Sequence, residues 1–249
     1  RRKLLKNFGL NIHRPKRPGS MWARVTALGS YREVGRACHL VTTNESRIMI
    51  DVGVNVANDN DPMPFFNAPE ALPVDKLDAV ILTHAHLDHA GMLPILFKYG
   101  YRGPVYCTPP TRDLMLLLQT DYLKIGGSEG KMAPYSMEDI RTCQRHVVDV
   151  AWDQTTDIAP DVKMTFSNSG HILGSSAVHL HIGDGKHNLL FSGDQKYEKS
   201  WLFDAANTRF PRVESLVLES TYGSEGDYQP SRQEANQELK DIVSRTLNR

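Results

Sequence analysis

Long apolar runs, net charge and cysteine are all scarce in this sequence. No apolar run approaches the ~18 residues that a membrane-spanning helix needs, so no such helix is expected. Lysine and arginine together number 29, as do aspartate and glutamate, so overall charge does not point to nucleic acid. The three cysteines, Cys38, Cys107 and Cys143, lie far apart and form no C-x-x-C pair. This spacing argues against a disulfide framework and predicts reduced, mostly buried thiols in a cytoplasmic protein.

Charge is uneven at the amino-terminal end, although it is balanced overall. The charged residues of segment 1–17 are all basic: Arg1, Arg2, Lys3, Lys6, Arg14, Lys16 and Arg17. A basic segment of this kind can lie along phosphates, and it can equally be a solvated linker. At the other end, Ser231 and Glu234 form a capping box that opens an amphipathic helix with no closing Gly or Pro. We therefore expect a segment of a longer protein.

The order of secondary structure follows from alternation, composition and turn residues. Strands are predicted at Trp22–Leu28, His39–Thr43, Arg47–Asp51, Asp78–Leu82, Val105–Cys107, Val162–Ser167, Ala177–Ile182, His187–Phe191 and Ser215–Glu219. Helices are predicted at Ala90–Phe97, at Thr111–Ile125 and from Ser136 onward. Strands with helices before, between and after them predict an α/β fold in which one sheet packs on another with helices outside.

The stretch LTHAHLDHAGML, residues 82–93, concentrates nitrogen and carboxylate donors. His84 and His86 alternate after an apolar strand, so in an extended backbone their rings point to the same side. Asp88 and His89 follow where the next helix is expected to begin. Imidazole nitrogens and carboxylate oxygens are ligands that zinc takes in proteins. The spacing therefore predicts two metal positions, one at the histidine pair and one at the Asp-His pair that follows.

Two later loops can supply the remaining ligands. NSGHILGSS places His171 in a glycine-flanked loop after a strand, and LLFSGD places Asp194 at the end of another strand. The two oxygens of Asp194 can bridge two ions. The predicted ligand sets are His84, His86, His171 and Asp194 for one ion, and Asp88, His89 and Asp194 for the other. The second set is short of the usual four ligands, so we expect weaker occupancy there and a missing ligand beyond Arg249.

These motifs carry a resemblance to a known family. The order H-x-H-x-D-H, Gly-His loop and S-G-D resembles the metallo-β-lactamase superfamily. Within that superfamily, REVGR at 32–36, IDVGVN at 50–55, GHILGS at 170–175 and LESTYG at 218–223 resemble the β-CASP nucleases. The similarity is greatest to the archaeal relatives of the endonuclease subunit of the cleavage and polyadenylation specificity factor.

The resemblance implies a fold and a division of the chain. The fold is an α/β metallo-β-lactamase αββα sandwich, most of it present, truncated at the start of an inserted β-CASP domain. Residues 1–19 are then a linker or the tail of a preceding KH RNA-binding region. Residues 20–225 belong to the metallo-β-lactamase domain, and residues 226–249 begin the β-CASP domain.

The resemblance also implies a function. It points to a metal-dependent ribonuclease of RNA 3′-end processing or transcription termination, which acts on single-stranded RNA with a hydroxide activated by two zinc ions. Asp88 would serve catalysis as well as metal binding. Asp51 would orient the ligand loops, and Glu219 would support a general-acid histidine that lies beyond this chain. A homodimer would form through regions outside this segment.

The ligand cluster alone leaves other functions open. It equally fits a small-molecule metallo-hydrolase that acts on a thioester, lactone or lactam. A non-catalytic RNA-processing scaffold is a further alternative. A second H-x-H pair, His179 and His181, alternates with apolar residues and has no acid at ligand spacing, so we interpret it as surface or interface histidines. The sequence does not locate the aromatic and basic side chains on which single-stranded nucleic acids usually bind.

Overall fold

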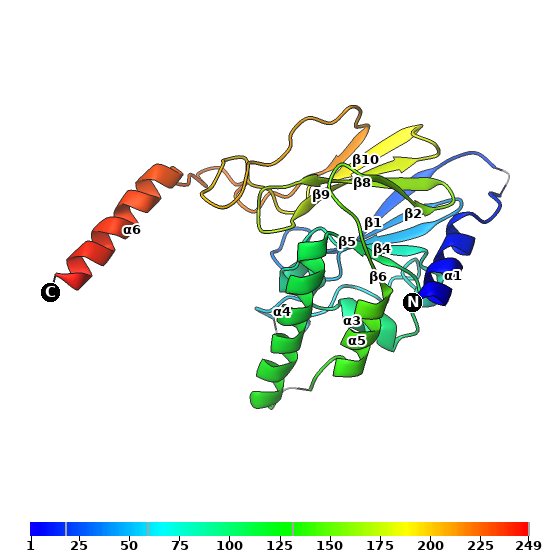
Figure 1. Ribbon diagram of the computed structural model, residues 1–249, viewed down its shortest axis with the longest axis horizontal. Coiled ribbons are helices and arrows are strands. Elements are labelled where there is room, and N and C mark those ends of the chain that lie inside the picture. Colours follow the sequence, from blue (N-terminus) through cyan, green and yellow to red (C-terminus); the bar gives the residue numbers. More distant parts are fainter. Residues whose placement is uncertain (18, 59, 131, 249) are drawn as a thin grey trace.

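Two β-sheets form the centre of the molecule (Figure 1). The computed structural model describes residues 1–17, 19–58, 60–130 and 132–248. The first sheet has the order β1 (Ala23–Gly29), β2 (Cys38–Thr43), β3 (Arg47–Ile50), β4 (Ala79–Ile81), β5 (Val105–Cys107), β6 (Val147–Asp149). The second has the order β11 (Ser215–Val217), β10 (His187–Phe191), β9 (Ser176–Ile182), β8 (Val162–Asn168), β7 (Thr155–Ala159).

Helices cover the face of the first sheet that points away from the second. The helices are α1 (Arg2–Ile12), α2 (Leu87–Ala90), α3 (Leu93–Lys98), α4 (Pro109–Ser128), α5 (Met137–His146) and α6 (Arg232–Leu247), with a 3-10 turn η1 at Val74–Lys76. Figure 1 shows α3, α4 and α5 on one side of the first sheet and β8 to β10 on the other. The predicted α/β fold with sheet packed on sheet is confirmed.

The core consists of two apolar layers, one on each face of the first sheet. Met49 faces the helices, where it belongs to the same buried cluster as Met115 and Ile140. Ile48 and Ile50, its neighbours along β3, face the second sheet, because successive strand residues point to opposite faces. This double burial explains why the strands of this sheet are apolar on both faces. All three cysteine thiols are free and buried in these layers or at their edge, as predicted.

The topology brings several strand ends to one edge of the sandwich. Strands β3, β4, β5 and β6 pair in parallel, and β10 pairs in parallel with β11. The carboxyl ends of parallel neighbours lie at the same sheet edge, where ligands bind in open α/β sheets. Asp51 follows β3, Thr83 follows β4, and Asp194 follows β10. Residues distant in sequence are therefore delivered to one region.

The two terminal helices are held very differently. Phe8 of α1 is buried, and Arg14, just beyond α1, forms an ion pair with Asp78 at 2.7 Å, so one face of the basic amino-terminal segment packs on the body. Helix α6 has no buried residue and projects away from the body (Figure 1). No described helix is both long and apolar enough to cross a membrane. Residues 18 and 249, within the predicted ranges 1–19 and 226–249, lie outside the described residues.

Several elements differ from the sequence prediction. Strands β6 and β7 were not predicted, and β11 ends at Val217, which leaves Glu219 in the following loop. Helix α2 begins at Leu87, so that His86 is its N-cap residue. The prediction of a surface position was wrong for His179, which is 3% exposed. Its ring packs near Phe210, and its Nε2 donates to the carbonyl oxygen of Arg212 at 2.9 Å.

Candidate metal centre

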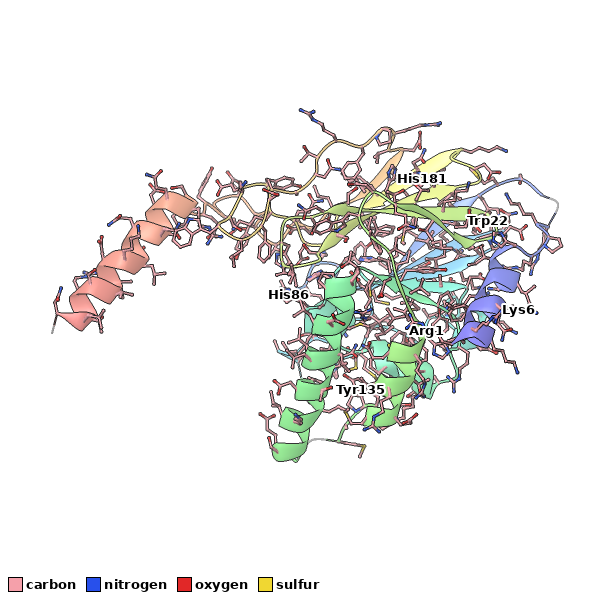
Figure 2. All side chains as sticks on the ribbon, in the orientation of Figure 1. Arg1, Lys6, Trp22, His86, Tyr135 and His181 are labelled. Carbon is pink, nitrogen blue, oxygen red and sulfur yellow. The ribbon has the colours of Figure 1, made fainter. Side chains whose placement is uncertain are left out.

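Four predicted ligand residues from three loops come together at the sheet edge. His86 Nδ1 lies 3.1 Å from His84 Nε2 and 3.1 Å from His171 Nε2. Asp194 Oδ2 lies 3.8 Å from His84 Nε2 and 3.5 Å from His171 Nε2. One donor atom from each of the four residues lies within 4.8 Å of all the others. Figure 2 shows His86 at the level where α4 approaches the sheets.

These separations fit a single metal ion. A tetrahedral ion bound at about 2.0–2.2 Å requires donor atoms to be about 3.3–3.6 Å apart. Four of the six donor separations range from 3.1 to 3.8 Å, and all six are within 4.8 Å. The donors are three imidazole nitrogens and one carboxylate oxygen, a set that suits zinc and other divalent transition metals. The arrangement can therefore hold a metal ion without movement of the loops.

The remaining predicted ligands lie on the other side of Asp194. His89 Nε2 is 3.3 Å from Asp194 Oδ1 and 3.8 Å from Asp88 Oδ2. Asp194 thus directs one oxygen to each set. This second group contributes three residues, one fewer than the first, and it borders a cleft of about 730 Å³. The first set's three histidines do not line that cleft.

Hydrogen bonds behind the ligands determine which ring nitrogens are free. Thr83 donates its hydroxyl to Asp51 Oδ2 at 2.8 Å, so its oxygen accepts from His84 Nδ1 at 3.0 Å. Asp51 Oδ2 also lies 2.8 Å from His89 Nδ1 and accepts from it. With its Nδ1 protonated, the neutral His84 ring presents an unprotonated Nε2 to the donor cluster, and the bond from His89 Nδ1 to Asp51 leaves His89 Nε2 as the nitrogen that faces Asp194. Fixing the ring tautomer in this way is a common role of groups behind metal ligands.

Burial and charge give the two rings opposite protonation behaviour. Burial and the neighbouring imidazoles hold the pKa of His84 well below its usual value, so this ring is neutral and can donate a lone pair. Burial opposes charge on His89 as well, but Asp51 and Asp194 overcome it and raise the pKa of His89 well above its usual value. A cation therefore suits the space between those two carboxylates, whether that cation is a proton or a metal.

Replacing Thr83 with valine tests the hydrogen bonds behind the ligands. Valine keeps the shape of threonine but cannot donate to Asp51 or accept from His84. We expect metal affinity to fall by about 10–100-fold, the usual cost of losing a group that orients a ligand. Metal titration followed by calorimetry measures the change. Thr120→Val is the matched control, since among the described residues its hydroxyl hydrogen-bonds only to the Leu116 carbonyl oxygen of the same helix. Equal affinities in the two variants would contradict the assignment.

Backbone contacts hold the three ligand loops together. The Ser176 amide donates to the Thr83 carbonyl oxygen at 2.8 Å, which joins the start of β9 to the end of β4. The Lys196 amide donates to the Ser169 carbonyl oxygen at 2.9 Å, which joins the loops of Asp194 and His171. These loops are therefore positioned by the sheets and do not depend on a metal ion alone for their arrangement.

Gly53 packs closely against the loop that carries Asp88 and leaves no space for a side chain. A Cβ atom at Gly53 would lie 1.6 Å from the Asp88 carbonyl oxygen and 2.8 Å from the Ala37 amide. The Ala37 amide also donates to that same carbonyl oxygen at 2.8 Å. The segment after β3 therefore lies directly against the ligand loop, and only glycine leaves enough room.

A Gly53→Ala variant is expected to be destabilised because the added methyl group meets backbone atoms that cannot move independently. The expected loss is about 3 kcal/mol or more in the free energy of unfolding, at the upper end for overpacking. Urea denaturation of the metal-free protein measures it. Gly126→Ala in α4 is the control: its added Cβ has no neighbour within 4 Å, and alanine favours the helix by about 0.5–1 kcal/mol. A Gly53→Ala variant as stable as the unmodified protein would disprove the close packing.

The cleft beside the second ligand group collects further polar residues. Asp51, Asp88, His89, Asp194 and Glu219 all line it. Glu219 accepts from the Thr221 amide at 2.9 Å, which fixes its carboxylate in the wall. Sequence reasoning missed the Thr83 hydroxyl and the contribution of segment 30–35 to the cleft. The first had a signal, since a hydroxyl directly preceded the first ligand; the second depends on packing that no local pattern records.

Comparisons with known proteins identify relatives of this chain. It is 52% identical over 249 residues to a protein named transcription termination factor FttA from Methanosarcina mazei. It is 51% identical over 251 residues to a protein of the same name from Methanothermobacter thermautotrophicus. Each match covers 100% of this chain and 39% of the relative. The chain therefore spans well under half the length of the curated relatives that it matches.

A solved structure and a family model complete the comparison. The crystal structure of a protein of unknown function from Enterococcus faecalis V583 matches with a TM-score of 0.56 and 15% identity, over 86% of this chain and 53% of that one. This likeness concerns the fold. The model of the metallo-beta-lactamase superfamily matches residues 31–240, which is most of the chain. The chain therefore belongs to the metallo-beta-lactamase superfamily.

Proposed function

We propose that this chain carries the metal centre of a zinc-dependent ribonuclease that acts on single-stranded RNA in 3′-end processing or transcription termination. The observation that carries the proposal is the meeting of His84, His171 and Asp194, from three separate loops, in one donor cluster. Membership of a superfamily of metal-binding proteins supports hydrolysis, and the names of the relatives support a role in termination. A cleft of about 730 Å³ beside the cluster provides space for a substrate.

Divalent metal ions at these positions would supply Lewis-acid charge for the phosphoryl oxygens and a nucleophile from water near neutral pH. The chain's own residues hold the arrangement in place. Thr83 and Asp51 fix the rings of His84 and His89, and Asp194 joins the two ligand groups. Cleavage would leave a 3′-hydroxyl and a 5′-phosphate.

Glu219 and Asp88 complete the proposed site at the cleft. The carboxylate of Glu219 accepts a hydrogen bond from the Thr221 amide. In this position it would orient a general acid that protonates the leaving 3′-oxygen. Asp88 combines metal binding with a position on the cleft wall. We extend the proposal to the division 1–19, 20–225 and 226–249, in which α6 begins an inserted β-CASP domain.

The proposal is tested by cleavage of an end-labelled single-stranded RNA by the zinc-loaded, full-length protein. We expect metal-dependent cleavage and its loss in His84→Ala. His181→Ala is the matched control, because His181 lies in the second sheet, well apart from His86 in Figure 2, and contacts Asn188 and Thr165. Cleavage that persists in His84→Ala would refute the proposed centre.

The alternatives give different results in the same assay. A small-molecule metallo-hydrolase would leave RNA intact and hydrolyse a thioester, lactone or lactam substrate with the same dependence on His84. A non-catalytic scaffold would bind the RNA and cleave none of these substrates. The names of the relatives favour RNA over a small-molecule substrate, and the assembled donor cluster favours catalysis over a scaffold.

A further inference from the structure

One wall of the cleft is formed by segment 30–35, whose side chains have no role in the proposed metal centre. Its residues Ser30 and Arg32 have positive φ angles of 69° and 63°. Such angles are uncommon outside glycine and persist where the surroundings hold the backbone in place. The segment is therefore a fixed part of the wall, and its side chains have defined positions beside the ligand groups.

Arg36 anchors the end of this segment in the body of the protein. Its guanidinium is buried, forms ion pairs with Glu33 at 2.7 Å and with Asp61 at 2.6 Å, and lies over the Phe65 ring at 4.4 Å. The next residue, Ala37, is hydrogen-bonded to the Asp88 carbonyl oxygen. The Arg36 guanidinium is therefore paired within the protein, and the hydrogen bond from Ala37 holds this end of the segment against the Asp88 loop.

Arg32 has none of these attachments. It is exposed, it lines the cleft, and within the described part of the chain its guanidinium has no hydrogen bond, ion pair or ring contact. Among the described residues that line the cleft, Arg32 is the only arginine or lysine, whereas Asp88, Asp194 and Glu219 all line it. An unpaired guanidinium on the wall of the cleft that Asp88, His89 and Asp194 also line is suited to bind a phosphate, because its planar donors match phosphate oxygens.

Tyr31 provides an aromatic face at the same place. Its ring is 46% exposed, lines the cleft, and is held edge-on to the His39 ring at 5.4 Å. Its hydroxyl lies 3.1 Å from His39 Nδ1, which fixes the ring plane. Single-stranded nucleic acids bind where a base stacks on an aromatic ring and a cation contacts the backbone. Both features meet here in adjacent residues.

We propose that Tyr31 and Arg32 form a nucleotide subsite for single-stranded RNA, in which Tyr31 stacks on a base and Arg32 binds a phosphate next to the one that is cleaved. This inference rests on the proposed ribonuclease function and names the part of the site that recognises the polymer. Because the subsite holds a neighbouring nucleotide, its loss should weaken binding of RNA and leave the chemistry at the metal centre intact.

The test compares two substrates in the full-length, zinc-loaded protein. For a fluorescein-labelled single-stranded RNA, Arg32→Gln should raise the KM and the Kd about tenfold and lower the salt slope of binding by about 0.7, the loss of one phosphate contact. Hydrolysis of bis(4-nitrophenyl) phosphate, which has a single phosphate, should not change. Tyr31→Ala should raise the Kd for RNA about tenfold, and Tyr31→Phe, which keeps the ring, should retain most of the affinity.

Arg209→Gln is the matched control, since Arg209 is exposed, lies outside the cleft, and has no side-chain partner among the described residues. If Arg32→Gln behaves like Arg209→Gln while the unmodified protein cleaves RNA, the subsite is wrong and the proposed function stands. If Arg32→Gln lowers kcat on both substrates equally, Arg32 acts at the reacting phosphate and the inference is again wrong. If the unmodified protein neither binds nor cleaves RNA, both proposals fail.

Discussion

Replacing Asp194 with alanine is expected to lower RNA cleavage by about three orders of magnitude or more, because stabilisation by metal is worth several kcal/mol. Among the described residues, Asp194 is the one that supplies a donor to both ligand groups: one oxygen lies 3.5 Å from His171 Nε2 and the other 3.3 Å from His89 Nε2. Loss of this single carboxylate should weaken both metal positions together. Initial rates on labelled RNA, together with metal content, measure the effect.

Asp204 offers a matched control for this substitution. It lies on the same stretch after β10, its carboxylate is exposed, and its partner is Lys199 at 3.0 Å. Asp204→Ala should change stability by no more than about 0.5 kcal/mol and should retain full activity and metal content. If Asp194→Ala cleaves RNA as fast as Asp204→Ala does, Asp194 cannot be a shared ligand.

Removal of metal should lower the thermal stability of the protein substantially. A ligand that binds only the folded state at 1,000 times its Kd contributes about 4 kcal/mol. For a chain of this size we expect a fall in Tm on the order of 10 °C after chelation. Without a cation, Asp51, Asp88 and Asp194 are left close together around His89, which must then carry the compensating charge. Differential scanning calorimetry with and without chelator, followed by re-addition of zinc, measures the shift.

The same comparison in two variants shows where the stabilisation arises. His181→Ala, in the second sheet away from the centre, should show the same shift as the unmodified protein. His86→Ala should show a much smaller shift, since it has lost a donor to the fuller ligand set. A Tm that does not respond to chelation in any of the three proteins would mean that this fold gains no stability from a metal.

The sequence predicted most strands because their signals are local. Val105–Cys107 was placed correctly as a short apolar run, and the apolar spacing after Ser136 and the capping box at Ser231 marked two helix starts. Strand β7 was missed because Thr155–Ala159 opens with polar residues at the edge of its sheet and lacks alternation. Strand β6 follows α5 without any turn residue between them, so no local signal separates the two elements.

The site shows a similar division between local and tertiary information. The H-x-H-x-D-H run indicated metal chemistry by its spacing, and His171 and Asp194 were added because a glycine-flanked loop and a strand end could supply further ligands. Their convergence on the run is not a local property. That convergence depends on how two sheets meet. Tyr31 had no signal in the sequence, and Arg32 was noted only as the first residue of the REVGR motif, because the place of both residues on the cleft wall follows from the packing of Gly53 and Ala37 against the Asp88 carbonyl oxygen.

Metal content after zinc loading and exhaustive dialysis, measured by mass spectrometry for the unmodified protein, His171→Ala and His181→Ala, tests the centre most directly. His171 lies 85 positions from His86 in the sequence, yet its Nε2 is 3.1 Å from His86 Nδ1. We predict that the unmodified protein and His181→Ala retain one tightly held zinc ion and a second, weaker one. His171→Ala should lose the tight one. Equal zinc in all three proteins, or none in any, would contradict a shared centre built from three loops.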